Sequence, residues 1–211
     1  MSKALDIVAK ILSVVLYPLF IPTYGIALFC VAHNYQVAPL HAVWITIAII
    51  GTFILTCVLP ITAIWIMMKR GEVKDLYIDD PKERTMPYIY SALGFGFWSY
   101  LLVHILHAPA YLACVAIGAT IAIVLVALIN RYWKISAHLA GLGGLLGGLL
   151  SYCLGIGAIP TWGTLVLWLG LSWLLMMARL RLNAHTGAQV SAGWLLGLFC
   201  TFIPYLIISH V

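Results

Sequence analysis

Charged side chains are scarce in this sequence. Only 8% of its 211 residues are Asp, Glu, Lys or Arg, and six of these are acidic. Soluble globular domains carry about 25% charged residues, so the scarcity argues against an ordinary soluble domain. No polar stretch exceeds about 20 residues, which leaves no room for a second, soluble domain. The five cysteines form no CxxC pair and all lie in apolar stretches, where they are typical of buried small side chains rather than of a zinc or redox motif.

Long apolar runs take the place of the missing charge. Hydrophobic residues make up 64% of the chain, the mean hydropathy is +1.08, and a helix needs about 20 residues to cross a bilayer. Seven runs of suitable length lie at 11–32, 41–68, 88–106, 109–130, 136–155, 160–178 and 187–208. The sequence therefore predicts an integral membrane protein with an all-α, polytopic bundle of six to seven helices in a single transmembrane domain over residues 1–211.

Three details refine this prediction. The first run has about 22 residues, longer than the apolar core of a secretory signal, so we expect it to be a retained span. Pro18, Pro22 and Pro60 lie inside apolar runs and are expected to kink helices. In the segment AGLGGLLGGLL, residues 140–150, glycines recur at four-residue spacing, which indicates close helix packing rather than a phosphate-binding loop.

The charges fall on one predicted side of the membrane. With seven spans, the N-terminus and the loops at 69–87, 131–135 and 179–186 lie together, and these contain every acidic and basic residue of the chain. The basic residues are Lys3, Lys10, Lys69, Arg70, Lys74, Lys82, Arg84, Arg131, Lys134, Arg179 and Arg181. By the positive-inside rule, this side faces the cytoplasm.

Three of these loops carry residues suited to phosphoryl chemistry. The first is DDPKERTMP (79–87), with Lys82 and Arg84; the second is KISAH (134–138), with Ser136 and His138. The third is ARLRLNAHTGAQ (178–189), with Arg179, His185 and Gln189. Arginine binds phosphate bidentately, and an imidazole can act as nucleophile or as proton donor. The loops therefore predict a phosphate site at the membrane edge.

The spacing R-x5-H-x3-Q in the third loop resembles the last motif, S-R-x5-H-x3-D, of the type 2 phosphatidic acid phosphatase superfamily, which is related to vanadium haloperoxidases. ISAH at 135–138 resembles the family's P-S-G-H motif, and Arg84 with Pro87 resembles its K-x6-R-P motif. The motif order and the gaps between motifs also agree. The resemblance covers residues 80–200, the expected phosphatase-like core.

The resemblance implies a role for each matching residue. His185 would be the nucleophile that forms a phosphohistidine, and His138 would protonate the leaving group. Arg179, Arg84 and Ser136, with Lys82 or Lys74 in place of the first-motif lysine, would hold the phosphoryl oxygens. Gln189 stands where the family has the aspartate that orients the nucleophilic imidazole, and it can accept the same hydrogen bond without the charge. The resemblance implies no metal and no cofactor.

The expected function is thus a metal-independent phosphatase of phosphatidate, phosphatidylglycerol phosphate or polyprenyl pyrophosphate. Its partners would be the lipid phosphate and the surrounding membrane lipids, with no nucleic acid. Two alternatives stay open: a degenerate protein that binds or transports lipid phosphates, and a helical scaffold for a partner. A bacterial inner membrane is the expected location, although bacterial members of the family commonly place this site on the periplasmic side.

Overall fold

A computed structural model describes residues 2–73 and 85–209 of the chain. The described residues form eight separate helical segments, counting the continuous α3, η1 and α4 as one, and they form no strand. The helices are α1 (Ser2–Val15), α2 (Ile21–Gln36), α3 (Ala42–Phe53), the π-helical turn η1 (Ile54–Val58), α4 (Leu59–Lys69), α5 (Thr85–His104), α6 (Ala110–Asn130), α7 (Ala137–Gly155), α8 (Trp162–Arg181) and α9 (Gly187–Ser209). The prediction of an all-α fold is confirmed.

Five helical segments in the described part of the chain are long and apolar enough to cross a membrane. They are Ala42–Lys69, Ala110–Asn130, Ala137–Gly155, Trp162–Arg181 and Gly187–Ser209. These segments are those of an integral membrane protein. The count of seven spans is not confirmed. That α5 and the region before α3 also cross the membrane stays a prediction.

The first predicted span is wrong as a single helix. Residues 11–32 contain the end of α1, a turn over 16–20 and most of α2. Pro18 lies in that turn, and Pro22 is in the first turn of α2, where its missing N–H leaves no helical hydrogen bond unmade. The two prolines therefore separate two helices instead of kinking one, and hydropathy could not reveal this because the apolar run continues across the turn.

Pro60 lies inside a continuous helical segment, and the kink expected there stays a prediction. Pro60 follows the π-helical turn η1, which widens the helix over Ile54–Val58. A proline ring clashes with the carbonyl four residues earlier, and a wider turn relieves that clash. The segment Ala42–Lys69 consequently stays continuous across Pro60.

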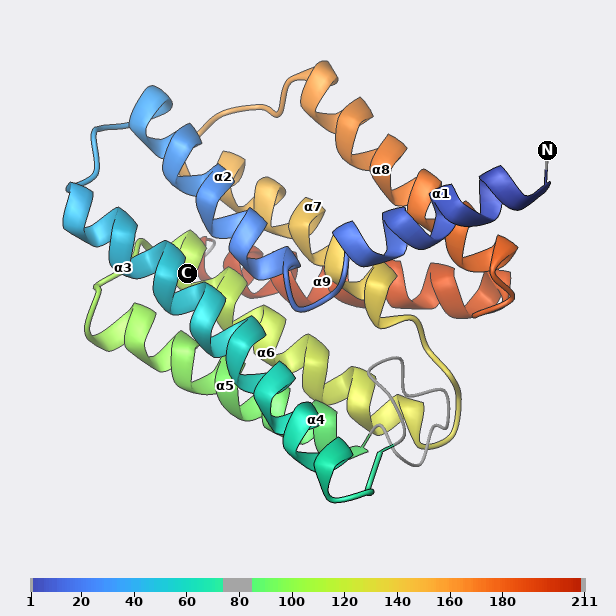
Figure 1. Cartoon of the computed structure of the whole chain (residues 1–211). Helices are drawn as coiled ribbons and strands as arrows, with labels where there is room; N and C mark the ends of the chain where they lie inside the picture. The colour runs from blue at the N-terminus through green and yellow to red at the C-terminus, as the bar shows by residue number, and fades with distance from the viewer. Residues whose placement is uncertain (1, 74–84, 210–211) are drawn as a thin grey trace.

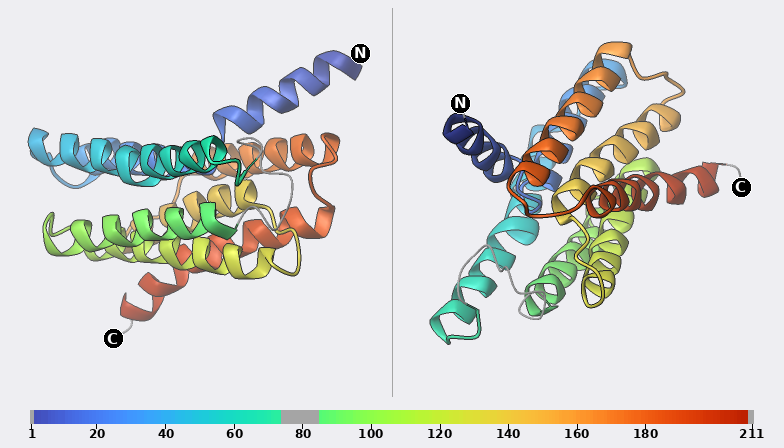
Figure 2. Two further views of the ribbon diagram at one scale, coloured as in Figure 1. Left: turned by 60° about the horizontal axis from the view of Figure 1, so that its bottom comes forward. Right: turned by 90° about the vertical axis from the view of Figure 1, so that its right-hand side faces the viewer.

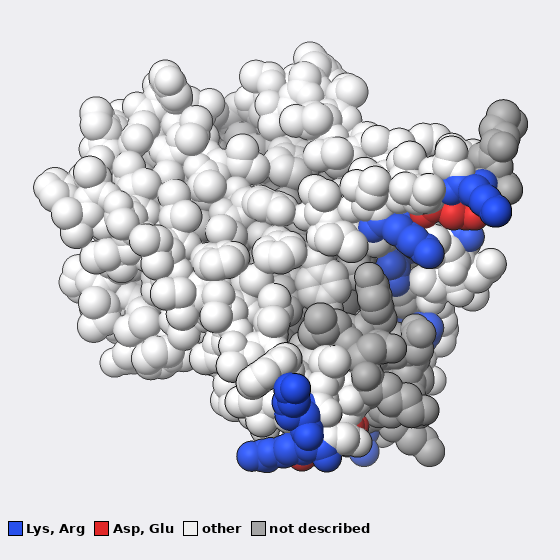
Figure 3. Space-filling model, viewed as in Figure 1, with Lys and Arg blue, Asp and Glu red and all other residues white. Residues whose placement is uncertain are grey.

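Most of the helices run roughly side by side, with their connections at two ends, whereas α1 projects obliquely from the bundle (Figure 1 and Figure 2). The links α2–α3, α5–α6 and α7–α8 lie at one end, and the links α6–α7 and α8–α9 lie at the other, together with the C-terminal end of α4. Figure 2 shows the two chain termini at opposite ends. On the face drawn in Figure 3, the basic side chains gather toward the end with the α6–α7 and α8–α9 links, and the opposite end is uncharged.

Helices α7 and α9 pack against each other more closely than any other pair in the described chain. A Cβ added at Gly143 would meet the carbonyl oxygen of Trp194, and one added at Gly197 would meet that of Ala140. The glycine-rich segment thus brings two backbones into contact, as its spacing predicts. This packing matters for the site because His138 lies at the start of α7 and His185 lies just before α9.

Candidate functional site

The N-termini of α7 and α9 meet at the charged end of the bundle. Ser136 is the N-cap of α7 and is fully buried; its Oγ accepts a hydrogen bond from the Leu139 N–H at 3.5 Å. The Ser136 N–H donates to the Gln189 carbonyl at 3.3 Å, and a Cβ at Gly193 would meet the Ser136 carbonyl. Two helix N-termini therefore lie side by side, and their dipoles favour an anion nearby.

His185 is fixed by the turn that precedes α7. Its Nδ1 donates a hydrogen bond to the Lys134 carbonyl at 3.1 Å. A carbonyl only accepts, so this contact places the proton of the neutral ring on Nδ1 and the lone pair on Nε2. The imidazole is half-buried and lines a cavity in the protein. This tautomer is the one that a nucleophilic Nε2 requires.

Gln189 forms a capping box with Thr186 at the start of α9. The Thr186 N–H donates to Gln189 Oε1 at 2.9 Å, and the Gln189 N–H donates to Thr186 Oγ1 at 3.4 Å. These are the reciprocal hydrogen bonds of a T-x-x-Q helix start. The proposed catalytic role of Gln189 stays a prediction, but its amide oxygen serves the helix end, and the acceptor found for His185 is a main-chain carbonyl.

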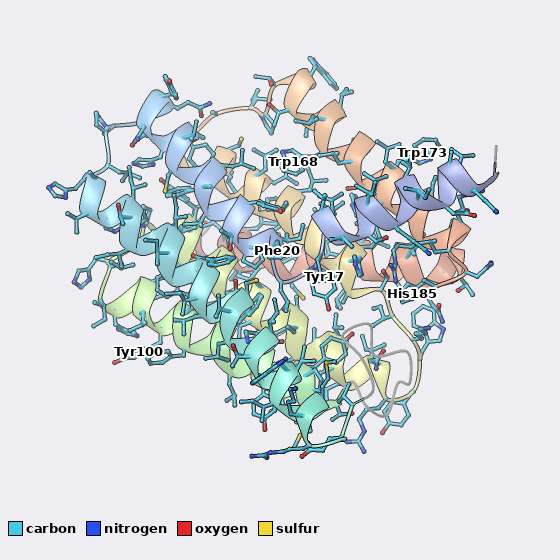
Figure 4. All side chains as sticks on the ribbon, in the orientation of Figure 1. Tyr17, Phe20, Tyr100, Trp168, Trp173 and His185 are labelled. Carbon is cyan, nitrogen blue, oxygen red and sulfur yellow. The ribbon has the colours of Figure 1, made fainter. Side chains whose placement is uncertain are left out.

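His138 lies in the first turn of α7 and faces the N-terminal helix. Its Nε2 donates to the Ser13 carbonyl at 3.1 Å, and its ring meets the Tyr17 ring edge-on, with centroids 5.5 Å apart. Figure 4 draws Tyr17 and His185 near each other, and both line one cavity. The turn between α1 and α2 therefore forms one wall of the site, although it lies outside the expected core of 80–200.

Ser13 is a site residue that the motifs do not reveal. Its side chain is 7% exposed and lines the same cavity, and its buried Oγ has no hydrogen-bond partner among the described residues. An unsatisfied buried hydroxyl costs free energy, so one beside His138 suggests a position where a ligand supplies the missing partner. A lone serine belongs to no sequence pattern, so Ser13 could not be predicted from the sequence.

Arg179 lies near the C-terminal end of α8 and lines the cavity together with both histidines. A cation suits this end of a helix, since the last carbonyls carry partial negative charge. The salt bridge between Arg181 Nε and Asp6 Oδ1, 2.7 Å long, ties α1 to the same part of α8. Lys82 and Arg84, the residues expected from the first loop, lie outside the described residues.

A single cavity of about 460 Å³ connects these residues to the interior. Ser13, Tyr17, His138, Arg179 and His185 line its charged end, and most of its remaining wall is apolar. The apolar part passes between α2, α5, α6 and α7. Ligand pockets typically have volumes of about 300–1,000 Å³, so the cavity is large enough for a small amphiphile with an anionic head and an apolar tail.

Comparisons with family models, with curated proteins and with solved structures found no match to this chain. The resemblance to the type 2 phosphatidic acid phosphatases therefore rests on the three motifs alone.

Proposed function

We propose that this protein is a metal-independent phosphatase of lipid phosphates or pyrophosphates that forms a phosphohistidine on His185. The observation that carries the proposal is the tautomer of His185, whose Nδ1–H is held by the Lys134 carbonyl, at the charged end of a cavity that is otherwise largely apolar. Candidate substrates are phosphatidate, phosphatidylglycerol phosphate and polyprenyl pyrophosphate. Their shared chemistry is a phosphoryl group joined to a hydrocarbon chain.

The first chemical step forms a bond between His185 Nε2 and phosphorus. The bond from phosphorus to the leaving oxygen breaks, and that oxygen takes a proton from His138. Because the Nε2–H of His138 is held by the Ser13 carbonyl, Nδ1 is the nitrogen that gives up the proton. Arg179 and the paired N-termini of α7 and α9 offset the negative charge on the phosphoryl oxygens.

The second step releases phosphate. Water attacks the phosphohistidine, and His138 accepts the proton that water loses, which restores its acidic form for the next cycle. The bond between phosphorus and Nε2 breaks, and the imidazole of His185 returns to its starting tautomer. Ser136, with Arg84 and Lys82 from the first loop, would add further contacts to the phosphoryl oxygens.

The test is phosphate release by purified protein from a panel of the three lipid classes without added metal. His185→Ala should abolish release, because it removes the nucleophile. His104→Ala is the matched control: His104 lies at the C-terminal end of α5, is exposed and does not line the cavity. The enzyme proposal is overturned if the wild type releases no phosphate from any of the three classes.

The second candidate is a protein that binds or transports lipid phosphates without hydrolysing them. It is favoured by the neutral partner of His185, since a carbonyl stabilises a cationic imidazole less than a carboxylate does. Changing Gln189 to Asp separates the candidates: turnover that appears only in this variant identifies a degenerate phosphatase. Vanadate or phosphate should raise the melting temperature under either candidate, and no shift would favour a scaffold without a site.

We place the protein in a bacterial inner membrane, with the charged end of the bundle in the cytoplasm by the positive-inside rule. Reporter fusions at the two termini test this placement. The rule predicts a cytoplasmic N-terminus, and an odd number of spans predicts a C-terminus on the other side.

A further inference from the structure

Small residues form part of the apolar wall of the cavity. On α7 these are Gly141, Gly144 and Gly148, and on α6 they are Ala116, Ala119 and Ala122. Gly141 and Gly148 face α2 and α6, because a Cβ added there would meet Ile21 and Val115. Gly143 and Gly147 face α9, and Gly144 also borders α9 at Thr201. The glycine-rich segment therefore packs closely on α9 and also contributes small residues to the wall of the cavity.

The cavity extends along most of α7. His138 lines its charged end and Tyr152 its other end, fourteen residues further along α7. At 1.5 Å per residue this separation is about 21 Å. One leaflet of a bilayer has an apolar thickness of about 15 Å, half of the hydrocarbon core. A cavity of this length fits an extended hydrocarbon chain whose phosphate lies at the His138 end.

Three aromatic rings close the far end of the cavity. Phe29 and Tyr152 meet edge-on with centroids 5.8 Å apart, and Tyr111 and Tyr152 meet edge-on at 5.6 Å. Each of the three residues is less than one-tenth exposed and lines the cavity. The Tyr111 ring is held in place, because its hydroxyl pairs with His33 Nδ1 at 3.0 Å and its ring packs directly on Gly155.

A second apolar space offers a way in from the membrane. A groove of about 400 Å³ lies between α2 and α8, and Leu28, Leu145 and Trp168 line both this groove and the cavity. Leu28 and Val31, which also border the groove, are about half exposed. A chain can therefore pass sideways from the bilayer into the cavity while its phosphate remains at the membrane edge.

We propose that the cavity binds one hydrocarbon chain of a lipid phosphate and that the rings of Phe29, Tyr111 and Tyr152 set the longest chain that it accepts. The position of the phosphate rests on the proposed function. The occupant is a single chain, since an elongated, largely apolar space of about 460 Å³ is suited to one tail.

The test is a series of saturated alkyl phosphates of increasing length, with dissociation constants measured for the protein in nanodiscs of fixed lipid composition. Burying one methylene contributes about 0.8 kcal/mol, so affinity should rise about fourfold with each added carbon and stop rising at a cut-off length. The ligand partitions into the nanodisc lipid equally for every variant, so this contribution cancels when a variant is compared with wild type at the same chain length.

Two opposite substitutions should move the cut-off in opposite directions. Ala119→Leu adds a side chain midway along the cavity and should shorten the cut-off. Tyr152→Ala removes part of the aromatic end and should lengthen it, and Phe29→Leu is the milder variant if Tyr152→Ala does not fold. Ala127→Leu is the matched control, because Ala127 is also half-buried on α6 but does not line the cavity.

The outcomes separate this proposal from the proposed function. If the variants bind and hydrolyse alkyl phosphates with an unchanged cut-off, the aromatic end does not measure chain length and the proposal is overturned, while the phosphatase stands. If the cut-off moves as expected but no alkyl phosphate or lipid is hydrolysed, the chain site stands and the phosphatase fails. An affinity that does not depend on chain length overturns the chain site altogether.

Discussion

His185 donates a hydrogen bond from Nδ1 to the carbonyl of Lys134 across 3.1 Å, so the turn before α7 orients a side chain that precedes α9. The close packing of α7 on α9 sets the register between these two turns. An acceptor in the main chain cannot be removed by a side-chain substitution at position 134. This hydrogen bond therefore depends on the packing of two helices rather than on the residue type at position 134.

The capping box at the start of α9 leads to a prediction for Gln189. Gln189→Ala removes the acceptor for the Thr186 N–H and should lower the free energy of unfolding by about 1 kcal/mol, as lost helix caps do. Thermal unfolding in detergent measures the loss. Gln189→Glu keeps the acceptor and should leave stability within about 0.5 kcal/mol of wild type. A loss of phosphate release in Gln189→Ala at unchanged stability would instead show that the amide acts on the imidazole.

Ser13 should respond to substitution in two opposite ways. Ser13→Ala removes a buried hydroxyl that has no partner in the described chain, so the unliganded protein should be as stable as wild type or more stable. The same change removes a donor facing the cavity and should weaken vanadate binding about three- to tenfold. The backbone carbonyl that holds His138 is unaffected. Thermal unfolding and vanadate titration measure the two effects.

Ser172→Ala is the control for this prediction. Ser172 is as buried as Ser13, but its hydroxyl donates to the Trp168 carbonyl at 2.8 Å and accepts from Trp194 Nε1 at 3.0 Å. Its removal leaves the half-buried indole N–H of Trp194 without this acceptor, so stability should fall while vanadate affinity stays the same. If Ser13→Ala loses stability in the same way, its hydroxyl has a structural role and no part in binding.

The helices were predictable from the sequence because apolar runs of membrane length leave few alternatives. Six of the seven expected runs coincide with helical segments. The break between α1 and α2 was not predictable, because Leu16, Leu19 and Phe20 continue the apolar run across the turn. Hydropathy records which residues avoid water, and it says nothing about where the chain changes direction within the apolar region.

The site was predictable to the extent that it uses side chains at fixed spacing. His138, Arg179 and His185 were proposed in this way; all three line one cavity, and their roles stay predictions. The Lys134 carbonyl and the Ser13 hydroxyl were not found. The first is a backbone group that every residue possesses, and the second lies in a helix more than 100 residues from both histidine motifs.

Replacing a glycine in the contact between α7 and α9 with alanine should destabilise the protein. Gly143→Ala places a methyl group against the Trp194 carbonyl and should lower the free energy of unfolding by about 1–3 kcal/mol, the usual cost of overpacking. Gly170→Ala is the matched control on α8, where nothing lies within 4 Å of the added carbon. Gly170→Ala should stabilise the protein by about 0.5–1 kcal/mol, because alanine has a higher helix propensity than glycine. Equal effects at the two positions would contradict the packing described here.

The two tyrosines at the end of the cavity should differ when each loses its hydroxyl. Tyr111→Phe breaks the buried hydrogen bond to His33 Nδ1 and should cost about 0.5–1.5 kcal/mol, the range for such bonds in water and in membranes. Tyr152→Phe removes a buried hydroxyl without a partner among the described residues, so stability should be unchanged or higher. Both variants keep the ring, and the longest alkyl phosphate bound should stay the same in each. Thermal unfolding checks the stabilities, and a shift of the cut-off in Tyr152→Phe would mean that its hydroxyl, rather than its ring, limits the chain.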